Sequence, residues 1–170
     1  MRLVLIAVLA AIVACTSIAN EAEETGLRCL DCTDETVIRV IDGDTLDTTR
    51  GRVRLFRVDT PERGERCASE ATDRLQELAG DSVRLEDGPR QTDQFGRLLA
   101  YVYTKDGVSI DETLIREGLA TAWIRDGQDR DLLVNLENDA RRKYAGCLWW
   151  VTGGWLGIPK NVGGDTYTDT

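Results

Sequence analysis

Three short runs of strand-forming residues follow one another between Thr36 and Val58, and only short turns separate them. The runs are Thr36–Ile41, Thr45–Thr49 and Arg52–Val58, and apolar and polar residues alternate at the start of the third. β-Branched residues and alternation indicate strands, and the Asp-Gly and Arg-Gly pairs between the runs are typical of turns. We therefore expect a three-stranded meander.

The rest of the chain predicts two or three more short strands and about three helices. The capping box Ser109-x-x-Glu112 opens one helix, and apolar residues recur at helical spacing in the other two. The expected helices are 67–79, 109–118 and 131–145; the expected strands are 82–85 and 97–104, with 119–124 a further candidate and 88–96 a polar loop. This order lacks the regular strand–helix alternation of a parallel sheet. It predicts an α+β fold, a small closed barrel rich in antiparallel pairs with the helices packed outside.

The N-terminus has the features of an export signal. The apolar run of residues 3–14 is too short to span a bilayer but suits the core of a signal peptide, which we assign to residues 1–14. Residues 12–15 resemble a lipobox, in which Cys15 would carry a lipid, whereas residues 17–19 offer an ordinary cleavage site. The sequence thus predicts an exported protein, either extracellular or anchored to the membrane through Cys15.

Cysteine usage agrees with an oxidising compartment. Of the five cysteines, Cys15 belongs to the leader, and the remaining even number suggests two disulfides. Three pairings are open, of which we favour Cys29–Cys32 with Cys67–Cys147. A redox-active Cys29-x-x-Cys32 motif and a four-cysteine zinc site are the alternatives.

Charge divides the chain into distinct parts. The net charge is −9, and residues 15–35 form an acidic tether before the domain at 36–149. Within that domain six arginines cluster between Arg50 and Arg66, next to the aspartates of the first turn. A tail rich in Gly and Trp occupies residues 150–170. Histidine is absent, so catalysis would depend on carboxylates, arginines or a hard metal ion.

Three segments carry residues that would suit phosphodiester hydrolysis. Asp44 and Asp59, with the carbonyl of Thr60, would offer oxygen ligands to a hard cation. Arg54 and Arg97 would hold a phosphate with their forked guanidinium groups, and Glu62 would orient or deprotonate a water molecule. Each of these residues alone has an ordinary structural explanation, because Asp-Gly-Asp is usually a turn.

The position of Arg54 relative to Asp59 sets a geometric condition. The two residues differ in parity, so in a regular strand their side chains would point to opposite faces. They can share one site only if a bulge or bend separates them. The apolar pair Leu55-Phe56 interrupts the alternation at the required place.

Four motifs together resemble the staphylococcal nuclease (thermonuclease) family. They are VIDGDT, RLFRVDTPE, TDQFGRLLAYVY and LIREGLA, found in this order between Val37 and Trp149. The resemblance implies a five-stranded OB-type barrel with three helices that hydrolyses DNA and RNA with Ca²⁺ and leaves 3′-phosphates. It implies Asp44, Asp59 and Thr60 as metal ligands with Asp42 nearby, and Arg54, Glu62 and Arg97 as catalytic residues. We expect a monomer without a protein partner.

The chain departs from the family pattern where substrate would be held. Gln94-Phe95 replaces the usual Lys-Tyr. The tyrosines expected after the LIREGLA motif are missing, and Trp123 lies in that segment instead. We therefore expect Gln94, Phe95 and Trp123 to alter how the protein binds its substrate. The alternative functions are a catalytically silent OB-type module that binds nucleic acid or another partner, and a calcium-binding adhesion module. The complete set of carboxylates and arginines argues against the silent module, and Glu62 and Arg97 argue against the adhesion module.

Overall fold

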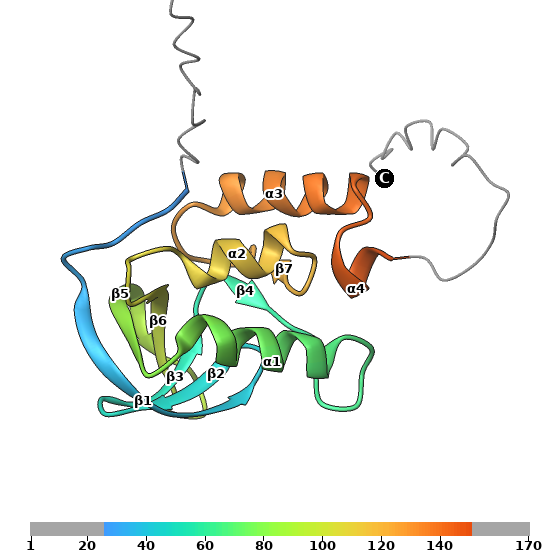
Figure 1. Ribbon diagram of the computed structural model, residues 1–170. Helices are drawn as coiled ribbons and strands as arrows, with labels where there is room; N and C mark the ends of the chain where they lie inside the picture. Colours follow the sequence, from blue (N-terminus) through green and yellow to red (C-terminus); the bar gives the residue numbers. More distant parts are fainter. Residues whose placement is uncertain (1–25, 151–170) are drawn as a thin grey trace, which may run out of the picture.

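Five strands close into a barrel with the helices packed to one side (Figure 1). The structure, a computed structural model, describes residues 26–150. Around the barrel the strands follow the order β1-β2-β3-β6-β5. Their bounds are β1 Thr33–Asp42, β2 Thr45–Thr48, β3 Gly51–Leu55, β5 Ser82–Thr92 and β6 Leu98–Thr104. The predicted meander is β1-β2-β3, and the predicted five-stranded α+β barrel is confirmed.

Four helices and one small sheet complete the fold. Helix α1 packs on β1, and α2 lies between α1 and α3 (Figure 1). The bounds are α1 Ala68–Ala79, α2 Ile110–Arg116, α3 Arg130–Arg142 and the single turn α4 Gly146–Trp149. The expected helix 131–145 therefore ends earlier, and α4 is an addition. Within residues 26–150, no helix is both long and apolar enough to cross a bilayer.

Three details of the barrel differ from the sequence-based expectation. Strand β5 continues to Thr92, through most of the expected polar loop 88–96; its exposed arm bulges between Asp87 and Thr92, pairs with β6 again at Thr92–Leu98, and needs no apolar side chains. Strand β1 begins at Thr33, so the end of the expected tether pairs with β5 and closes the barrel. Strands β3 and β6 pair in parallel, which makes the barrel mixed.

The chain bends between Arg54 and Asp59, as the parity of these residues required. Strand β3 ends at Leu55, and the next strand, β4 (Val58–Asp59), leaves the barrel to pair with β7 (Thr121–Ala122). The bend is therefore confirmed, but it is a complete interruption of the strand rather than a bulge within it. The interruption frees Asp59 to turn toward the face that carries Arg54.

Arg57 fixes this bend from inside the protein. Its side chain is 3% exposed, and its guanidinium lies 3.7 Å from the centre of the Tyr101 ring. It donates to Asp129 at 2.7 Å and to the hydroxyl of Tyr103 at 3.2 Å, and it faces the Asp111 carboxylate at 3.8 Å. A buried arginine needs such partners, because an unpaired charge in the interior is costly. No pattern in the sequence indicates this role of Arg57.

Asp111 should make the stability of the protein depend on pH. Burial of this fully enclosed carboxyl raises its pKa from 3.8 to about 6, although the charge of Arg57 opposes the shift. The protonated form therefore stabilises the fold, and this contribution is lost as pH rises from about 4 through about 6. We expect the loss to be about 3 kcal/mol by pH 7.

The measurement is urea unfolding of the wild type and Asp111→Asn over a pH series. The difference between the two proteins isolates this group, because carboxylates with lowered pKa values, such as Asp47 and Asp93, act equally in both. We expect Asp111→Asn to lack the fall in stability between pH 4 and 7. Parallel curves for the two proteins would contradict the assignment.

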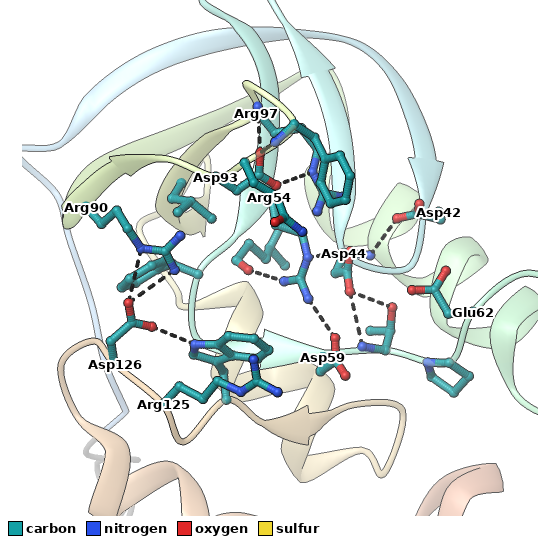
Figure 2. A pocket seen from close by; sticks show the side chains of 18 residues that line it. Asp42, Asp44, Arg54, Asp59, Glu62, Arg90, Asp93, Arg97, Arg125 and Asp126 are labelled. Atoms are coloured by element: carbon teal, nitrogen blue, oxygen red, sulfur yellow. Dashed lines mark hydrogen bonds and ion pairs between the residues drawn. The ribbon is translucent and has the colours of Figure 1, made fainter.

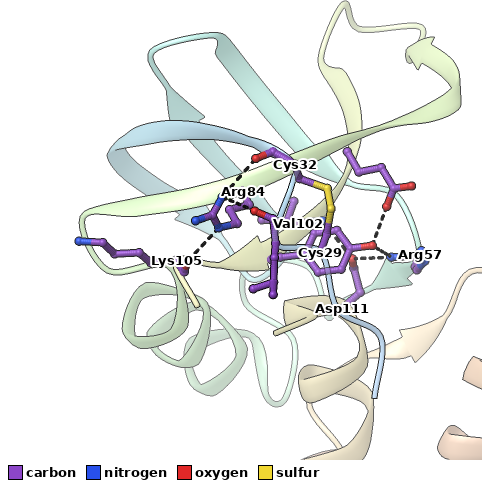
Figure 3. The surroundings of a disulfide bond; sticks show 10 residues. Cys29, Cys32, Arg57, Arg84, Val102, Lys105 and Asp111 are labelled. Carbon is purple, nitrogen blue, oxygen red and sulfur yellow. Dashed lines mark hydrogen bonds and ion pairs between the residues drawn. A yellow bond between two sulfur atoms is a disulfide. The ribbon is translucent and has the colours of Figure 1, made fainter. Parts of the chain in front are cut away.

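The described cysteines form two disulfides of very different span. Cys29 and Cys32 are joined with their Cα atoms 5.6 Å apart, and Cys67 and Cys147 with theirs 5.7 Å apart. Figure 3 shows the first of these, where Arg84 donates to the carbonyls of both Leu30 and Cys32. The Cys29–Cys32 bridge closes a short loop just before β1, and Arg84 of β5 holds this loop to the barrel, whereas Cys67–Cys147 ties the start of α1 to α4.

The two disulfides should differ in their contribution to stability. The Cys67–Cys147 bridge separates its cysteines by 80 positions and the Cys29–Cys32 bridge by 3. Since loop-closure entropy grows with loop length, we expect Cys67→Ser/Cys147→Ser to lose about 3–5 kcal/mol and Cys29→Ser/Cys32→Ser about 1–2 kcal/mol. Urea unfolding without reductant measures both. The reverse ranking would contradict the entropic account.

Candidate active site

One cavity of about 460 Å³ collects all ten substrate, metal and catalytic residues predicted from the sequence (Figure 2). Its wall is formed by the β1–β2 turn, β3, the segment after β4, the β5–β6 connection and the segment after β7. The predicted residues in this wall are Asp42, Asp44, Arg54, Asp59, Thr60, Glu62, Gln94, Phe95, Arg97 and Trp123. The predicted lipidation site Cys15, the signal peptide and residues 151–170 lie outside the described residues.

Asp44 is the most enclosed carboxylate of the cavity. Its side chain accepts hydrogen bonds from the backbone N–H and the hydroxyl of Thr60, both at 3.1 Å, and from the Thr45 hydroxyl at 3.0 Å. Only 7% of the residue is exposed. Burial raises the pKa of Asp44 and the nearby Asp42 carboxylate raises it further, while the Arg54 guanidinium opposes both effects. Additional positive charge beside Asp44 would favour its ionised form.

Gly43 lets the β1–β2 turn come close to the rest of the site. A Cβ atom at this position would lie 2.7 Å from the Thr60 hydroxyl and 2.8 Å from the Cβ of Ala71 in α1. No real Cβ atom tolerates such contacts, so any larger residue would push the turn away from Thr60. The glycine is required for close approach, and this approach allows Thr60 to donate to Asp44.

Arg54 joins the carboxylates on the two sides of the bend. Its guanidinium faces Asp44 at 3.1 Å and donates to Asp59 at 2.7 Å (Figure 2). It also donates to the carbonyls of Leu55 and Val58, which flank the interruption between β3 and β4. An arginine has five N–H donors, so one remains uncommitted within the described part of the chain.

Arg97 stands at the start of β6 and is held by two neighbours. Asp93 accepts from its Nε at 2.7 Å, and the guanidinium donates to the Thr45 hydroxyl at 3.2 Å. Burial raises the pKa of Asp93, but hydrogen bonds from Arg97 and from the backbone outweigh this effect and hold it below the ordinary value. Thr45 thus links Arg97 to Asp44, and three N–H donors of Arg97 have no partner among residues 26–150.

Glu62 and Asp42 occupy the opposite side of the cavity from Arg90 (Figure 2). Asp42 accepts from the backbone N–H of Asp44 at 3.2 Å. The loop that carries Glu62 is held by Glu65, whose carboxylate accepts from the backbone N–H of Glu62 at 2.9 Å. The Glu62 carboxylate itself makes no ion pair with any described residue. It therefore remains available to a water molecule or a ligand.

The three residues expected to alter substrate binding also line the cavity. Gln94 and Phe95 lie in the connection between β5 and β6, and Phe95 is 75% exposed. Trp123 is half-buried, and its indole N–H donates to Asp126 at 2.7 Å. An exposed aromatic ring at the rim and a fixed indole in the wall are features of surfaces on which bases stack.

Comparison with known proteins places the chain in a family. The staphylococcal nuclease homologue family matches residues 52–150, more than half of the chain. The chain belongs to the staphylococcal nuclease family. An uncharacterized endonuclease of Escherichia coli O157:H7 is 34% identical over 119 residues, which cover 66% of this chain and 74% of that protein. The micrococcal nuclease of Shigella flexneri is 32% identical over 127 residues, with coverage of 66% and 71%.

One further relative is longer than this chain. The endonuclease YncB of Bacillus subtilis is 41% identical over 98 residues, but these make up 50% of this chain and 46% of that protein. The segment matched to the family begins at Arg52 and so excludes Asp42 and Asp44. The position of these two carboxylates in the cavity is shown by the structure instead.

Sequence reasoning missed three polar residues of the cavity. Arg90 lies in the expected loop 88–96 but projects from β5, and Arg125 and Asp126 come directly after the candidate strand 119–124. The only signal for Arg90 in the sequence is its positive charge within the polar run 88–96. Nothing in the sequence indicated that β5 and the segment after β7 would meet.

Proposed function

We propose that this chain is an exported, calcium-dependent nuclease that hydrolyses phosphodiester bonds of DNA and RNA and leaves 3′-phosphate ends. The observation that carries the proposal is the contact of Arg54 with both Asp44 and Asp59, in the same cavity as Glu62 and Arg97. This arrangement brings together oxygen ligands for a metal ion, a carboxylate without an ion pair in the described structure, and two arginines that can bind phosphate. Membership of the staphylococcal nuclease family and the nuclease relatives support hydrolysis of nucleic acid.

The carboxylates and one carbonyl fit a hard divalent cation. Asp44 and Asp59 would be direct ligands with the Thr60 carbonyl, which accepts no hydrogen bond within residues 26–150, and Asp42 would act nearby. Such an all-oxygen set suits calcium. The raised pKa of Asp44 fits as well, because burial and the nearby Asp42 carboxylate disfavour its negative charge and a bound cation would offset both. When bound there, the cation would supply positive charge to the phosphate and to the attacking water.

The protein residues would divide the remaining chemistry between them. Glu62 would orient and deprotonate the water that attacks phosphorus. The free N–H donors of Arg54 and Arg97 would bind the non-bridging oxygens and stabilise the extra negative charge of the transition state. Asp93 and Thr45 hold Arg97 in place, so its donors are oriented before substrate arrives.

Export and a monomeric state are parts of the proposal that depend on the sequence. The apolar run of residues 3–14 supports a signal peptide, and the resemblance of residues 12–15 to a lipobox supports a lipid anchor at Cys15. The two disulfides among the described cysteines suit an oxidising compartment.

Digestion of short single-stranded DNA and RNA by the purified protein tests the function. We expect cleavage with Ca²⁺, none with a chelator, and recovery when Ca²⁺ is restored. End-group analysis should find 3′-phosphates in both digests. Equal cleavage with the chelator would contradict the metal requirement, and absence of cleavage under all conditions would contradict the nuclease activity.

The residues at the cavity rim should set the affinity for substrate. Gln94 and Phe95 provide neither positive charge nor a hydroxyl, so we expect Gln94→Lys/Phe95→Tyr to lower KM for short DNA by about three- to ten-fold with little change in kcat. Steady-state kinetics on DNA and RNA oligonucleotides measure both constants. An unchanged KM would show that these two positions do not control binding.

A further inference from the structure

The cavity continues past the proposed catalytic residues to a second end that the proposed chemistry does not use. Figure 2 shows Arg90, Arg125 and Asp126 on one side of Arg54, with Asp42 and Glu62 on the other. The second end is also lined by Phe56, Leu99 and Trp123. It contains two arginines and two aromatic rings in continuous space with the proposed site of cleavage.

Each arginine of this end lies near an aromatic ring. The guanidinium carbon of Arg90 lies 5.6 Å from the centre of the Phe56 ring, and that of Arg125 lies 5.1 Å from the Trp123 ring. Stacked arginine and aromatic surfaces are the combination with which proteins hold single-stranded nucleic acid, since the rings accept bases and the cations accept phosphates.

Asp126 fixes the geometry of this end without neutralising all of it. One of its oxygens accepts from Arg90 at 3.1 Å, and the other accepts from the Trp123 indole at 2.7 Å. Arg125 makes no ion pair with any residue from 26 to 150. Asp126 is thus committed on both oxygens, while the guanidinium of Arg125 and one nitrogen of Arg90 remain open to an anion.

A purely structural role explains only part of this arrangement. The Arg90–Asp126 pair could serve to tie β5 to the segment after β7, but both side chains are well exposed, and such pairs contribute little to stability. A tie would also leave no reason for Arg125 beside the same cavity. Two cations beside one carboxylate give a net positive end, which favours a negatively charged occupant.

We propose that Arg90 and Arg125 form a second phosphate subsite, which binds the backbone phosphate next to the one that is cleaved. The proposal rests on the proposed nuclease function and specifies its substrate as a strand of at least three nucleotides. Asp126 is the positioning residue of the subsite, because it holds Arg90 and Trp123 at fixed places. The intervening nucleotide lies against the half-buried Trp123, whereas Phe56 is 2% exposed and supports Arg90 from inside the protein.

Trinucleotides with one uncharged linkage test the subsite. A methylphosphonate resists hydrolysis and carries no charge, so it leaves one cleavable phosphodiester and removes the charge of its neighbour on the 5′ or 3′ side. The reference is the all-phosphodiester trinucleotide, cleaved at the same linkage. We expect the wild-type protein to cleave one of the two modified substrates with a kcat/KM about ten-fold lower than this reference, mainly because KM rises. The other should be affected much less.

The same comparison in variants assigns the effect to residues. Arg125→Gln breaks no ion pair seen in the described structure, so it should fold normally. We expect it to cleave the all-phosphodiester trinucleotide less well than the wild type does. It should also lose most of the ten-fold difference between that substrate and the modified one. Arg90→Gln should act in the same direction. Arg142→Gln is the control, because it removes another exposed arginine, at the end of α3 and outside the cavity, and it should keep the discrimination.

Two results would overturn the subsite while leaving the nuclease function in place. One is cleavage by the wild type that is indifferent to both uncharged linkages. The other is discrimination that Arg125→Gln and Arg90→Gln both retain in full. Absence of cleavage for every substrate would instead remove the proposed function, and the subsite with it.

Discussion

Replacing Arg54 with lysine is expected to lower kcat about a thousand-fold while changing KM only slightly. Arg54 contacts Asp44 and Asp59 and donates to two carbonyls at the bend between β3 and β4. A lysine has a single charged nitrogen and cannot make these contacts together while donating to phosphate. Removal of one pre-oriented donor to a developing negative charge typically costs about 10²–10³ in kcat. The loss of carboxylate positioning adds to this cost.

Arg50→Lys is the matched control for this experiment. Arg50 lies in the turn between β2 and β3, outside the cavity, and pairs with Asp87 at 2.7 Å. The same change of side chain there should leave kcat within about two-fold, because an exposed ion pair contributes little. Single-turnover kinetics on a labelled oligonucleotide would separate the chemical step from binding. A folded Arg54→Lys protein with kcat within ten-fold of wild type would contradict the proposed role.

Glu62→Gln should lower kcat by about 10²–10⁴, the range expected for loss of a general base. Glutamine keeps the size of the side chain but cannot accept a proton from water. The Glu62 carboxylate makes no ion pair in the described structure, so its replacement should leave the free energy of unfolding almost unchanged. The effect should therefore appear in the rate alone.

The pH dependence of kcat/KM distinguishes a base from a residue that only orients water. If Glu62 accepts the proton, the pH dependence of kcat/KM in Glu62→Gln should differ from that of the wild type, and the decline toward acid pH that remains should come from Asp44, whose pKa is raised. Glu70→Gln, an exposed change in the first turn of α1, should keep both the rate and the pH profile of the wild type. Retention of more than a third of the wild-type kcat in Glu62→Gln would exclude the proposed role.

The strands and helices that bury a regular apolar pattern were predictable from the sequence. The meander β1-β2-β3 and helices α1 and α2 follow from alternation, helical spacing and a capping box, and the structure confirms them. The outer part of β5 was not predictable in this way, because both of its faces are polar and its pairing with β6 depends on tertiary contacts. The periodicity of apolar residues indicates which face of an element is buried, and an exposed hairpin arm has no buried face.

The bend at Phe56-Arg57 shows how far the reasoning about the site could go. The parity of Arg54 and Asp59 required a bend, but parity cannot say what holds it. The answer is an arginine inside an apolar run, with Asp111 and Asp129 as its partners from distant helical segments. Gly43 gives a similar lesson, because a glycine beside two aspartates predicts a turn, whereas its contact with Thr60 depends on the folded structure.

The parallel seam between β3 and β6 links catalysis to the order of folding. Arg54 lies on one side of this seam, and Arg97 immediately precedes the other. The meander β1-β2-β3 and the β5–β6 hairpin can each form from neighbouring segments, but the seam joins segments far apart in the chain and should form late. A partly folded chain would thus carry carboxylates and arginines without a working site. During refolding, recovery of nuclease activity should coincide with closure of the barrel, later than most of the secondary structure.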